Sequence, residues 1–248
     1  MIDLRVDRSV ATVTLCRAPV NAMSDEWVER FHQVLDALDE RDDWLVLHVR
    51  SAQKIFSAGA DLSQIAENFS QPMEAQLDVG RRYQKLFHRI SRLSAITLAE
   101  IGATALGGGL ELALACDLRV ASSKAKMGFP EVTLGLIPGA GGTQRLTWLC
   151  GRAVASRLIL SGEVIPAEEA HRLGLVQWCL PPERFAEEAE QIANRYASMP
   201  RYAALGAKAA IAAALDPAVD GFALETEVVR TCFESAQTRS LVSSFLAR

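Results

Sequence analysis

Two glutamates stand in parts of the chain that are otherwise almost free of charge. Glu111 has only one charged companion, Glu100, between residues 98 and 115, and Glu131 is the only charged residue between 127 and 142. An ionised carboxylate in apolar surroundings is costly, so its pKa rises, and two such groups that lie close together share one proton. A pair of this kind supplies one general acid and one general base.

Glycines adjoin both glutamates. Gly107–Gly109 directly precede Glu111, and three more glycines lie between residues 139 and 142, after Glu131. Glycine leaves backbone N–H groups accessible, and such groups at a helix start favour an anionic oxygen. Two plainer interpretations stay open: a glutamate at a helix end, and a tight turn between strand and helix. Neither glycine segment has the lysine of a phosphate loop or the full dinucleotide fingerprint, so ATP and NAD are disfavoured.

The hydrophobic pattern predicts alternating strands and helices, which is typical of the α/β class. Strands are expected at residues 2–6, 10–16, 44–49, 96–101 and 118–121. Helices are expected at residues 24–40, 73–90, 110–115 and from 143, followed by helical segments at 183–198, 203–215 and 222–246. Ser24 suits the N-cap of the first helix because two acidic residues follow it. Glu111 is therefore expected on a helix and Glu131 in a loop.

The composition is that of an ordinary globular protein. Of the 248 residues, 50% are hydrophobic and 23% are charged, and the net charge of −4 offers no basic surface for nucleic acid. The five cysteines are widely spaced and form no Cys-x-x-Cys pair, which disfavours a disulfide framework and a metal site. No apolar run approaches the roughly 18 residues of a membrane span, so we expect a cytoplasmic protein that contacts no membrane.

Five linked motifs carry a resemblance to a known family. They are SAGAD at residues 57–61, ALGGGLELA at 105–113, ACD at 115–117, GFPE at 128–131 and LGLIPGAGGTQRL at 134–146. In order and spacing they resemble the crotonase, or enoyl-CoA hydratase/isomerase, family. The likeness extends from Val10 to about Leu180 and weakens in the helical C-terminal part.

The resemblance implies a fold, a ligand and an assembly. The fold is an α/β spiral of repeated ββα units, similar to ClpP, with a helical C-terminal oligomerisation region. Residues 1–194 are expected to form the core with the acyl-CoA site, and residues 195–248 a helical trimerisation region. The expected assembly is a homotrimer or a dimer of trimers. No metal or redox cofactor is expected, and coenzyme A is part of the substrate.

The resemblance also assigns roles to residues. Glu111 and Glu131 match the catalytic pair of the family. The backbone N–H groups of Ala60 and Gly108 match its oxyanion hole, and Gly139 matches a position near the attacking water. The residues expected to contact the substrate or its coenzyme A are Ala22, Met23, Ala58, Asp61, Leu62 and Phe129. At the Phe129 position many hydratases have glutamine, and no lysine or arginine is assigned to the coenzyme A phosphates.

The leading interpretation is hydration of a 2-enoyl-CoA to a 3-hydroxyacyl-CoA, or the reverse dehydration. The nearest alternative is Δ3,Δ2-enoyl-CoA isomerisation, which similar enzymes perform with one principal carboxylate, so the presence of two glutamates favours the hydratase. Decarboxylation and thioester hydrolysis use the same oxyanion loops and stay open. A non-catalytic acyl-CoA-binding module on the same fold is a further alternative, because a fold does not determine an activity.

Overall fold

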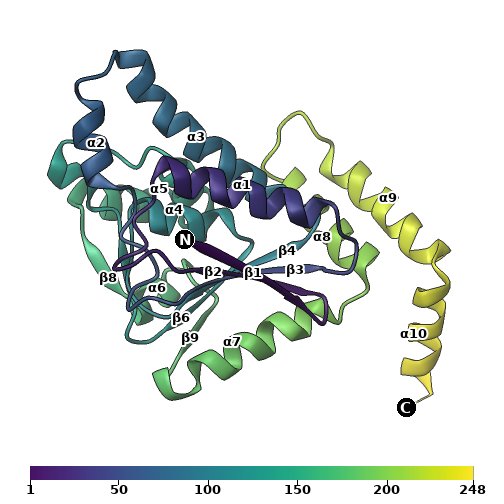
Figure 1. Cartoon of the computed structure of the whole chain (residues 1–248). Coiled ribbons are helices and arrows are strands. Elements are labelled where there is room, and N and C mark those ends of the chain that lie inside the picture. The colour runs from purple at the N-terminus through teal and green to yellow at the C-terminus, as the bar shows by residue number, and fades with distance from the viewer. Residues whose placement is uncertain (248) are drawn as a thin grey trace.

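A computed structural model describes residues 1–247, which form a mixed α/β structure (Figure 1). The main sheet has six strands in the order β1-β2-β3-β4-β6-β9, with β1 and β2 antiparallel and every later pair parallel. Its strands are β1 (Ile2–Asp7), β2 (Val10–Leu15), β3 (Val46–Ser51), β4 (Ile96–Ile101), β6 (Leu118–Ser122) and β9 (Trp178–Leu180). A second sheet contains β5 (Ala105–Leu106), β7 (Lys126–Gly128) and β8 (Val164–Pro166).

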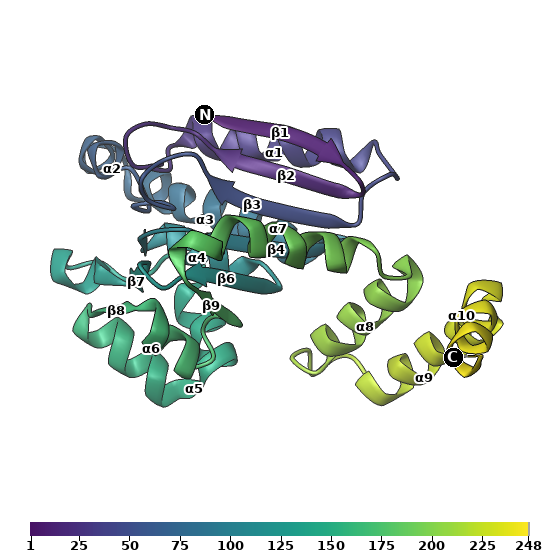
Figure 2. The ribbon, with the colours of Figure 1, turned by 90° about the horizontal axis from the view of Figure 1, so that it is seen from below.

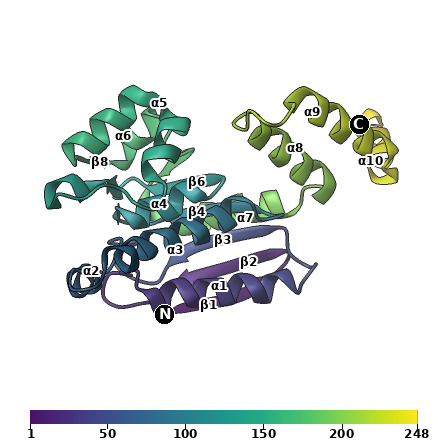
Figure 3. The same cartoon turned by 90° about the horizontal axis from the view of Figure 1, so that it is seen from above.

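Helices cover both faces of the main sheet. In Figure 3, α1 (Asp25–Asp39) and α3 (Met73–Ser91) lie on one face, and in Figure 2, α7 (Pro182–Ala197) lies across the other. The remaining helices are α2 (Leu62–Asn68), α4 (Gly108–Ala115), the 3-10 helix η1 (Pro130–Leu134), α5 (Gly142–Ser161), α6 (Ala167–Arg172), α8 (Arg201–Ala213), α9 (Gly221–Glu234) and α10 (Ala236–Leu246). This arrangement buries the central parallel strands on both sides.

The strands divide their side chains between two apolar clusters. Leu47 and Val49 of β3 join the large core under α1 and α3, whereas Val46 joins a smaller cluster against α7 that includes Phe185. Successive residues of a strand point to opposite faces, so a strand that is covered on both faces is apolar at almost every position. The strand β4 has this apolar pattern, and its limits at Ile96 and Ile101 are those predicted.

The first helix begins as predicted. The Ser24 hydroxyl accepts a hydrogen bond from the Trp27 N–H at 3.3 Å, and Asp25 and Glu26 occupy the positive end of the helix dipole. Trp27, Phe31 and the apolar residues that follow at helical spacing are buried. The predicted helix is confirmed in its start, its end near residue 40 and its buried face.

One predicted helix is wrong. Residues 222–246 do not form a single helix, because Ser235 has extended backbone angles (φ −69°, ψ 127°) and separates α9 from α10. The helices α2 and α6 and the short strands β5, β7, β8 and β9 are not predicted either, and Glu131 lies in the 3-10 helix η1 where a loop is expected. Strands of two or three residues are too short to show a periodicity of two.

The helices α8, α9 and α10 form an arm that extends away from the body (Figures 2 and 3). Lys208 of α8 fastens the arm, because its Nζ donates to Asp117 Oδ2 at 2.8 Å and to the Ala95 carbonyl at 2.7 Å. The expected boundary after residue 194 falls inside α7, which packs on the sheet and ends at Ala197. The division into a core and a trimerisation region stays a prediction.

Among residues 1–247, no helix combines the length and the apolar character that a membrane span needs.

Candidate active site

The turn between β5 and α4 is built from glycines that allow close packing. Gly107 has φ +50° and donates its N–H to the Gly128 carbonyl at 3.0 Å, which ties the turn to β7. A Cβ on Gly109 would lie 2.7 Å from the Cβ of Ser57, so this position has no room for a side chain. The glycines therefore bring the start of α4 against the loop of residues 57–61.

The Gly108 N–H points out of the start of α4. The carbonyl of Gly107 accepts a hydrogen bond from the Glu111 N–H at 2.9 Å, so it points along the helix. In a trans peptide the C=O and the following N–H point in opposite directions. The N–H of Gly108 is therefore directed away from the helix, toward a ligand position at its positive end.

The Ala60 N–H is oriented by the same kind of constraint. The Gly59 carbonyl accepts a hydrogen bond from the Met23 N–H at 2.8 Å, which directs the N–H of the same peptide, that of Ala60, to the opposite side. A Cβ on Gly59 would lie 3.0 Å from the Gly108 nitrogen, so the two segments are in direct contact. Within residues 1–247 neither N–H has a hydrogen-bond acceptor. Two adjacent unpaired amide donors are what a carbonyl oxygen that gains negative charge requires.

The Glu111 carboxylate lies inside the protein with two backbone donors on one oxygen. Its Oε1 accepts hydrogen bonds from the N–H groups of Ala140 and Gly142, both at 2.7 Å, and the residue is 3% exposed. Burial raises the pKa of Glu111 to about 7, while the two N–H donors act in the opposite direction because they stabilise the ionised form. Its protonation therefore changes close to neutral pH.

The Glu131 carboxyl covers the same glycine turn. A Cβ on Gly107 would lie 2.6 Å from Glu131 Oε1, so the carboxyl sits directly above Gly107. Its Oε2 is buried and has no hydrogen-bond partner within residues 1–247. Burial raises the pKa of Glu131 above its usual value, and the Glu131 charge in turn raises the pKa of Glu111. The structure thus brings both predicted glutamates to the turn that carries the Gly108 donor.

The other predicted site residues differ in accessibility. Ala58 and Leu62 are exposed beside the Ala60 donor, and Ala22 is partly exposed. Met23 is buried, and its Cε would lie 2.7 Å from a Cβ on Gly108, so its side chain supports the turn. Phe129 is also fully buried, with its ring against Gly142. A direct side-chain contact of Phe129 with substrate would require the site to open, because the ring lies beneath the surface.

Asp61 has structural partners already. It accepts a hydrogen bond from the Ser63 N–H at 3.1 Å, which caps α2, and its Oδ2 lies 2.8 Å from Arg17 Nη2. The hydrogen bond from Arg17 holds the pKa of Asp61 below its usual value. Arg17 also donates to the Ala22 carbonyl at 2.5 Å. Arg17 was not singled out in the sequence, since a lone arginine in a loop gives no signal of its partner.

Two further side chains near Glu111 were missed. Gln84 Nε2 of α3 donates to the Gly139 carbonyl at 2.8 Å, and Arg145 Nη1 of α5 donates to the Ala140 carbonyl at 3.0 Å. Both bonds fix the loop that supplies the donors to Glu111. Gln84 lies outside every motif, whereas Arg145 lies within the last one, where its type alone indicates no partner.

α4 is also fixed at its far end. Arg119 is 2% exposed, and its guanidinium donates to the carbonyls of Cys116 and Leu175, both at 2.7 Å. A cation at the C-terminal end of a helix complements the helix dipole and satisfies terminal carbonyls. Arg119 therefore holds the helix whose opposite end carries the Gly108 donor.

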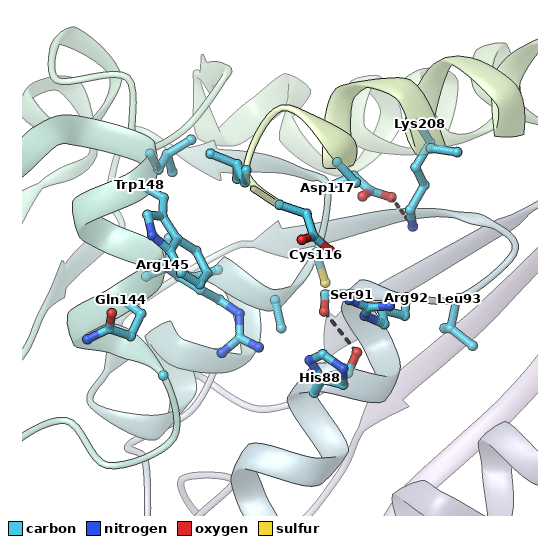
Figure 4. Close-up of a pocket in the computed structure, with 18 of the residues that line it drawn as sticks. His88, Ser91, Arg92, Leu93, Cys116, Asp117, Gln144, Arg145, Trp148 and Lys208 are labelled. Atoms are coloured by element: carbon cyan, nitrogen blue, oxygen red, sulfur yellow. Dashed lines mark hydrogen bonds and ion pairs between the residues drawn. The ribbon is translucent and has the colours of Figure 1, made fainter. Parts of the chain in front are cut away.

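A cleft of about 1290 Å³ lies between α3, α5 and the arm (Figure 4). Arg145 and Trp148 project into it from α5, His88 from α3 and Lys208 from α8. Ala140 and Gly141 form part of its wall, but neither Glu111 nor Glu131 does. The loop at residues 140–141 therefore borders both the cleft and the environment of Glu111.

Known proteins that are similar in sequence and structure belong to one family. A family model described as enoyl-CoA hydratase/isomerase matches residues 5–248. The chain is 34% identical to the short-chain-enoyl-CoA hydratase of Clostridium acetobutylicum, covering 100% of this chain and 95% of the relative. It is 36% identical to the crotonyl-CoA hydratase of Syntrophomonas wolfei, covering 92% of this chain and 88% of the relative. A crystal structure of an enoyl-CoA hydratase subunit from Geobacillus kaustophilus matches with a TM-score of 0.90 at 35% identity, covering 99% of this chain and 95% of that one.

These similarities define the class of protein. The structure has the crotonase fold, an α/β fold with a helical C-terminal region. The chain belongs to the enoyl-CoA hydratase/isomerase family.

Proposed function

We propose that this protein adds water to the double bond of a 2-enoyl-CoA to form a 3-hydroxyacyl-CoA, and catalyses the reverse dehydration. The observation that carries the proposal is the meeting of the buried Glu111 and the partly buried Glu131 with two unpaired amide donors at one glycine turn. The names of the hydratase relatives from Clostridium acetobutylicum and Syntrophomonas wolfei support the same reaction.

The amide donors activate the substrate. Water adds to carbon 3 of a conjugated thioester only if the carbonyl oxygen accepts the negative charge that develops. The N–H groups of Ala60 and Gly108 are proposed to stabilise that charge, because their directions are set by hydrogen bonds on the opposite edges of their peptides. Loss of one such donor typically lowers kcat by about 10²- to 10³-fold.

The glutamates move the protons. Glu111 is the proposed base, since its Oε1 already accepts two N–H hydrogen bonds that stabilise a negative charge. Glu131 is the proposed acid, since burial without a partner at Oε2 favours the neutral form. Glu111 takes a proton from water as the oxygen bonds to carbon 3, and Glu131 delivers a proton to carbon 2. The sum is addition of one water, after which the proton returns from Glu111 to Glu131.

Other residues receive supporting roles in the proposal. The N–H of Gly139 has no acceptor within residues 1–247 and is available to the attacking water. Ala22, Met23, Ala58, Asp61, Leu62 and Phe129 are proposed to shape the pocket for the acyl group and coenzyme A, Met23 and Phe129 by packing beneath it. These roles need no metal or redox cofactor, and we propose that the enzyme acts in the cytoplasm.

The arm supports a proposal on assembly. Phe222, Phe233 and Phe245 expose 86%, 73% and 73% of their surface, which is unusual for large apolar residues in an isolated chain. We propose that α8, α9 and α10 contribute to a homotrimer or a dimer of trimers. Sedimentation equilibrium tests this, and a monomer at micromolar concentration would contradict it.

The reaction is tested by mixing the protein with crotonyl-CoA and following the absorbance of the conjugated thioester. We expect the absorbance to fall as 3-hydroxybutyryl-CoA forms, and Glu111→Gln and Glu131→Gln to lower kcat by about 10²- to 10⁴-fold each. A constant absorbance together with turnover of a 3-enoyl-CoA would favour the isomerase. Binding of acyl-CoA without any turnover would favour the non-catalytic module.

A further inference from the structure

The helix α3 touches the loop that supplies the hydrogen bonds to Glu111. Gln84 Nε2 donates to the Gly139 carbonyl at 2.8 Å. Gly80, one helical turn earlier on the same face, comes close as well, since a Cβ there would lie 3.9 Å from the same carbonyl oxygen. Gln84 therefore reaches the loop from α3, a helix that carries neither of the two proposed catalytic glutamates.

Gln84 and Glu111 bind opposite edges of one peptide unit. The Gly139 carbonyl accepts from Gln84, and the N–H of the same peptide, that of Ala140, donates to Glu111 Oε1 at 2.7 Å. We infer that Gln84 is a positioning residue for the proposed base, because it fixes the peptide whose N–H Glu111 accepts. This inference rests on the proposed function only in that Glu111 is called the base. The hydrogen bonds that carry the inference do not depend on that assignment.

The two donors to Glu111 are not equally secured. The Gly142 N–H belongs to a peptide whose carbonyl, that of Gly141, accepts from the Arg145 N–H at 2.9 Å within the first turn of α5. The Gly139–Ala140 peptide precedes the helix and has no such bond. Within residues 1–247, Gln84 provides the hydrogen bond that the Gly139 carbonyl accepts.

The consequence of this bond is electrostatic. A peptide whose carbonyl accepts a hydrogen bond donates more strongly through its N–H. Loss of the Gln84 side-chain donor should weaken the Ala140 donor and make Glu111 harder to ionise. The other titratable groups that act on Glu111 are Glu131 of η1 and Arg145 of α5, which the Gln84 variants leave in place.

The test compares the isosteric variant Gln84→Met with the wild-type enzyme. We expect the acid limb of the kcat/KM profile, with its midpoint near the Glu111 pKa of about 7, to move upward by roughly half a pH unit, with little change in KM. Gln76→Met is the matched control, because Gln76 lies on the same helix and donates to the Gln71 carbonyl at 2.8 Å, away from the site. Its profile should superpose on that of the wild type.

A second measurement separates this inference from the proposed function. The glutamate carboxyl of Glu111 is titrated by carbon-13 NMR in the free protein, with Glu111→Gln used to assign its signal. A higher Glu111 pKa in Gln84→Met supports the positioning role even if no hydration is detected. The absence of hydration would reject the proposed function and leave this inference standing. A titration and a pH profile that match those of Gln76→Met would overturn the inference.

Discussion

Ser57 and Gly109 are in such close contact that a side chain at residue 109 would overlap residue 57. A Cβ on Gly109 would lie 2.7 Å from both the Cβ and the carbonyl oxygen of Ser57. The contact joins the loop that carries the Ala60 donor to the first turn of α4, which carries the Gly108 donor. The distance between the two donors thus depends on a glycine that belongs to neither of them.

Gly109→Ala should therefore disturb both stability and catalysis. The added methyl group meets backbone that cannot move freely, so we expect the free energy of unfolding to fall by about 1–3 kcal/mol, together with a loss in kcat. Chemical denaturation and the crotonyl-CoA assay measure the two effects. Gly221→Ala is the control, since its new Cβ would meet only an ordinary contact of 3.8 Å. Equal stability of the two variants would show that the contact with Ser57 leaves room for a Cβ at residue 109.

Ser57→Ala removes a hydroxyl that links the loop of residues 57–61 to the segment at Asn21. The Ser57 hydroxyl donates to the Asn21 carbonyl at 2.8 Å and accepts from the Gly59 N–H at 3.1 Å, and both partners are buried. Leaving these two polar groups without partners should cost about 1–3 kcal/mol of stability for each group. We expect kcat to fall by about tenfold, less than for loss of a complete donor, because the Gly59–Ala60 peptide is loosened and not removed.

Ser122→Ala provides the comparison for Ser57. Ser122 is also a buried serine, 2% exposed, and within residues 1–247 its hydroxyl accepts only a long hydrogen bond of 3.4 Å from the Lys124 N–H. It lies on β6, outside the proposed site, so its variant should retain kcat. If Ser57→Ala and Ser122→Ala retain kcat equally, the hydroxyl of Ser57 does not hold the Ala60 donor in place.

The raised pKa of Glu111 predicts a pH dependence of stability. The pKa is about 7 in the folded protein and 4.5 for a glutamate in water, the value expected in the unfolded chain. Between these two values the folded state holds a proton that the unfolded state has lost. The free energy of unfolding should therefore decrease as pH rises from 4.5 to 7, by about 3 kcal/mol from this group, and level off above 7.

Denaturation across this pH range is measured for the wild type and for Glu111→Gln. The glutamine cannot ionise, so the part of the decrease that comes from Glu111 should disappear in the variant. Parallel curves for the two proteins would reject the raised pKa.

The sequence predicts the chemical groups of the site better than it predicts the contacts that position them. Glu111 and Glu131 were found because charge is rare in apolar segments, and the structure buries Glu111 and largely buries Glu131. The glycines at 107 and 109 are visible in the sequence. The sequence does not show that Ser57 is the neighbour that leaves no room for a side chain at residue 109. Such contacts depend on how distant segments pack, which no local pattern encodes.

Gln84 and Ser235 are two further residues whose structural roles could not be predicted from local sequence patterns. Gln84 is an exposed glutamine on an amphipathic helix, where its type predicts only a solvent face, and its partner Gly139 is 55 residues away. Ser235 is extended and stands at the N-cap position of α10, which the helical spacing of apolar residues over 222–246 does not show. Both required the three-dimensional structure.

The central claim is that a thioester oxygen lies between the amides of Ala60 and Gly108, with its double bond beside Glu111 and Glu131. A crystal structure of Glu131→Gln with bound crotonyl-CoA tests it most directly. We predict the thioester oxygen at about 2.7–3.1 Å from both nitrogens, with carbon 3 facing Glu111 through one water molecule. A thioester bound elsewhere, for example in the cleft between α3, α5 and the arm, would contradict it.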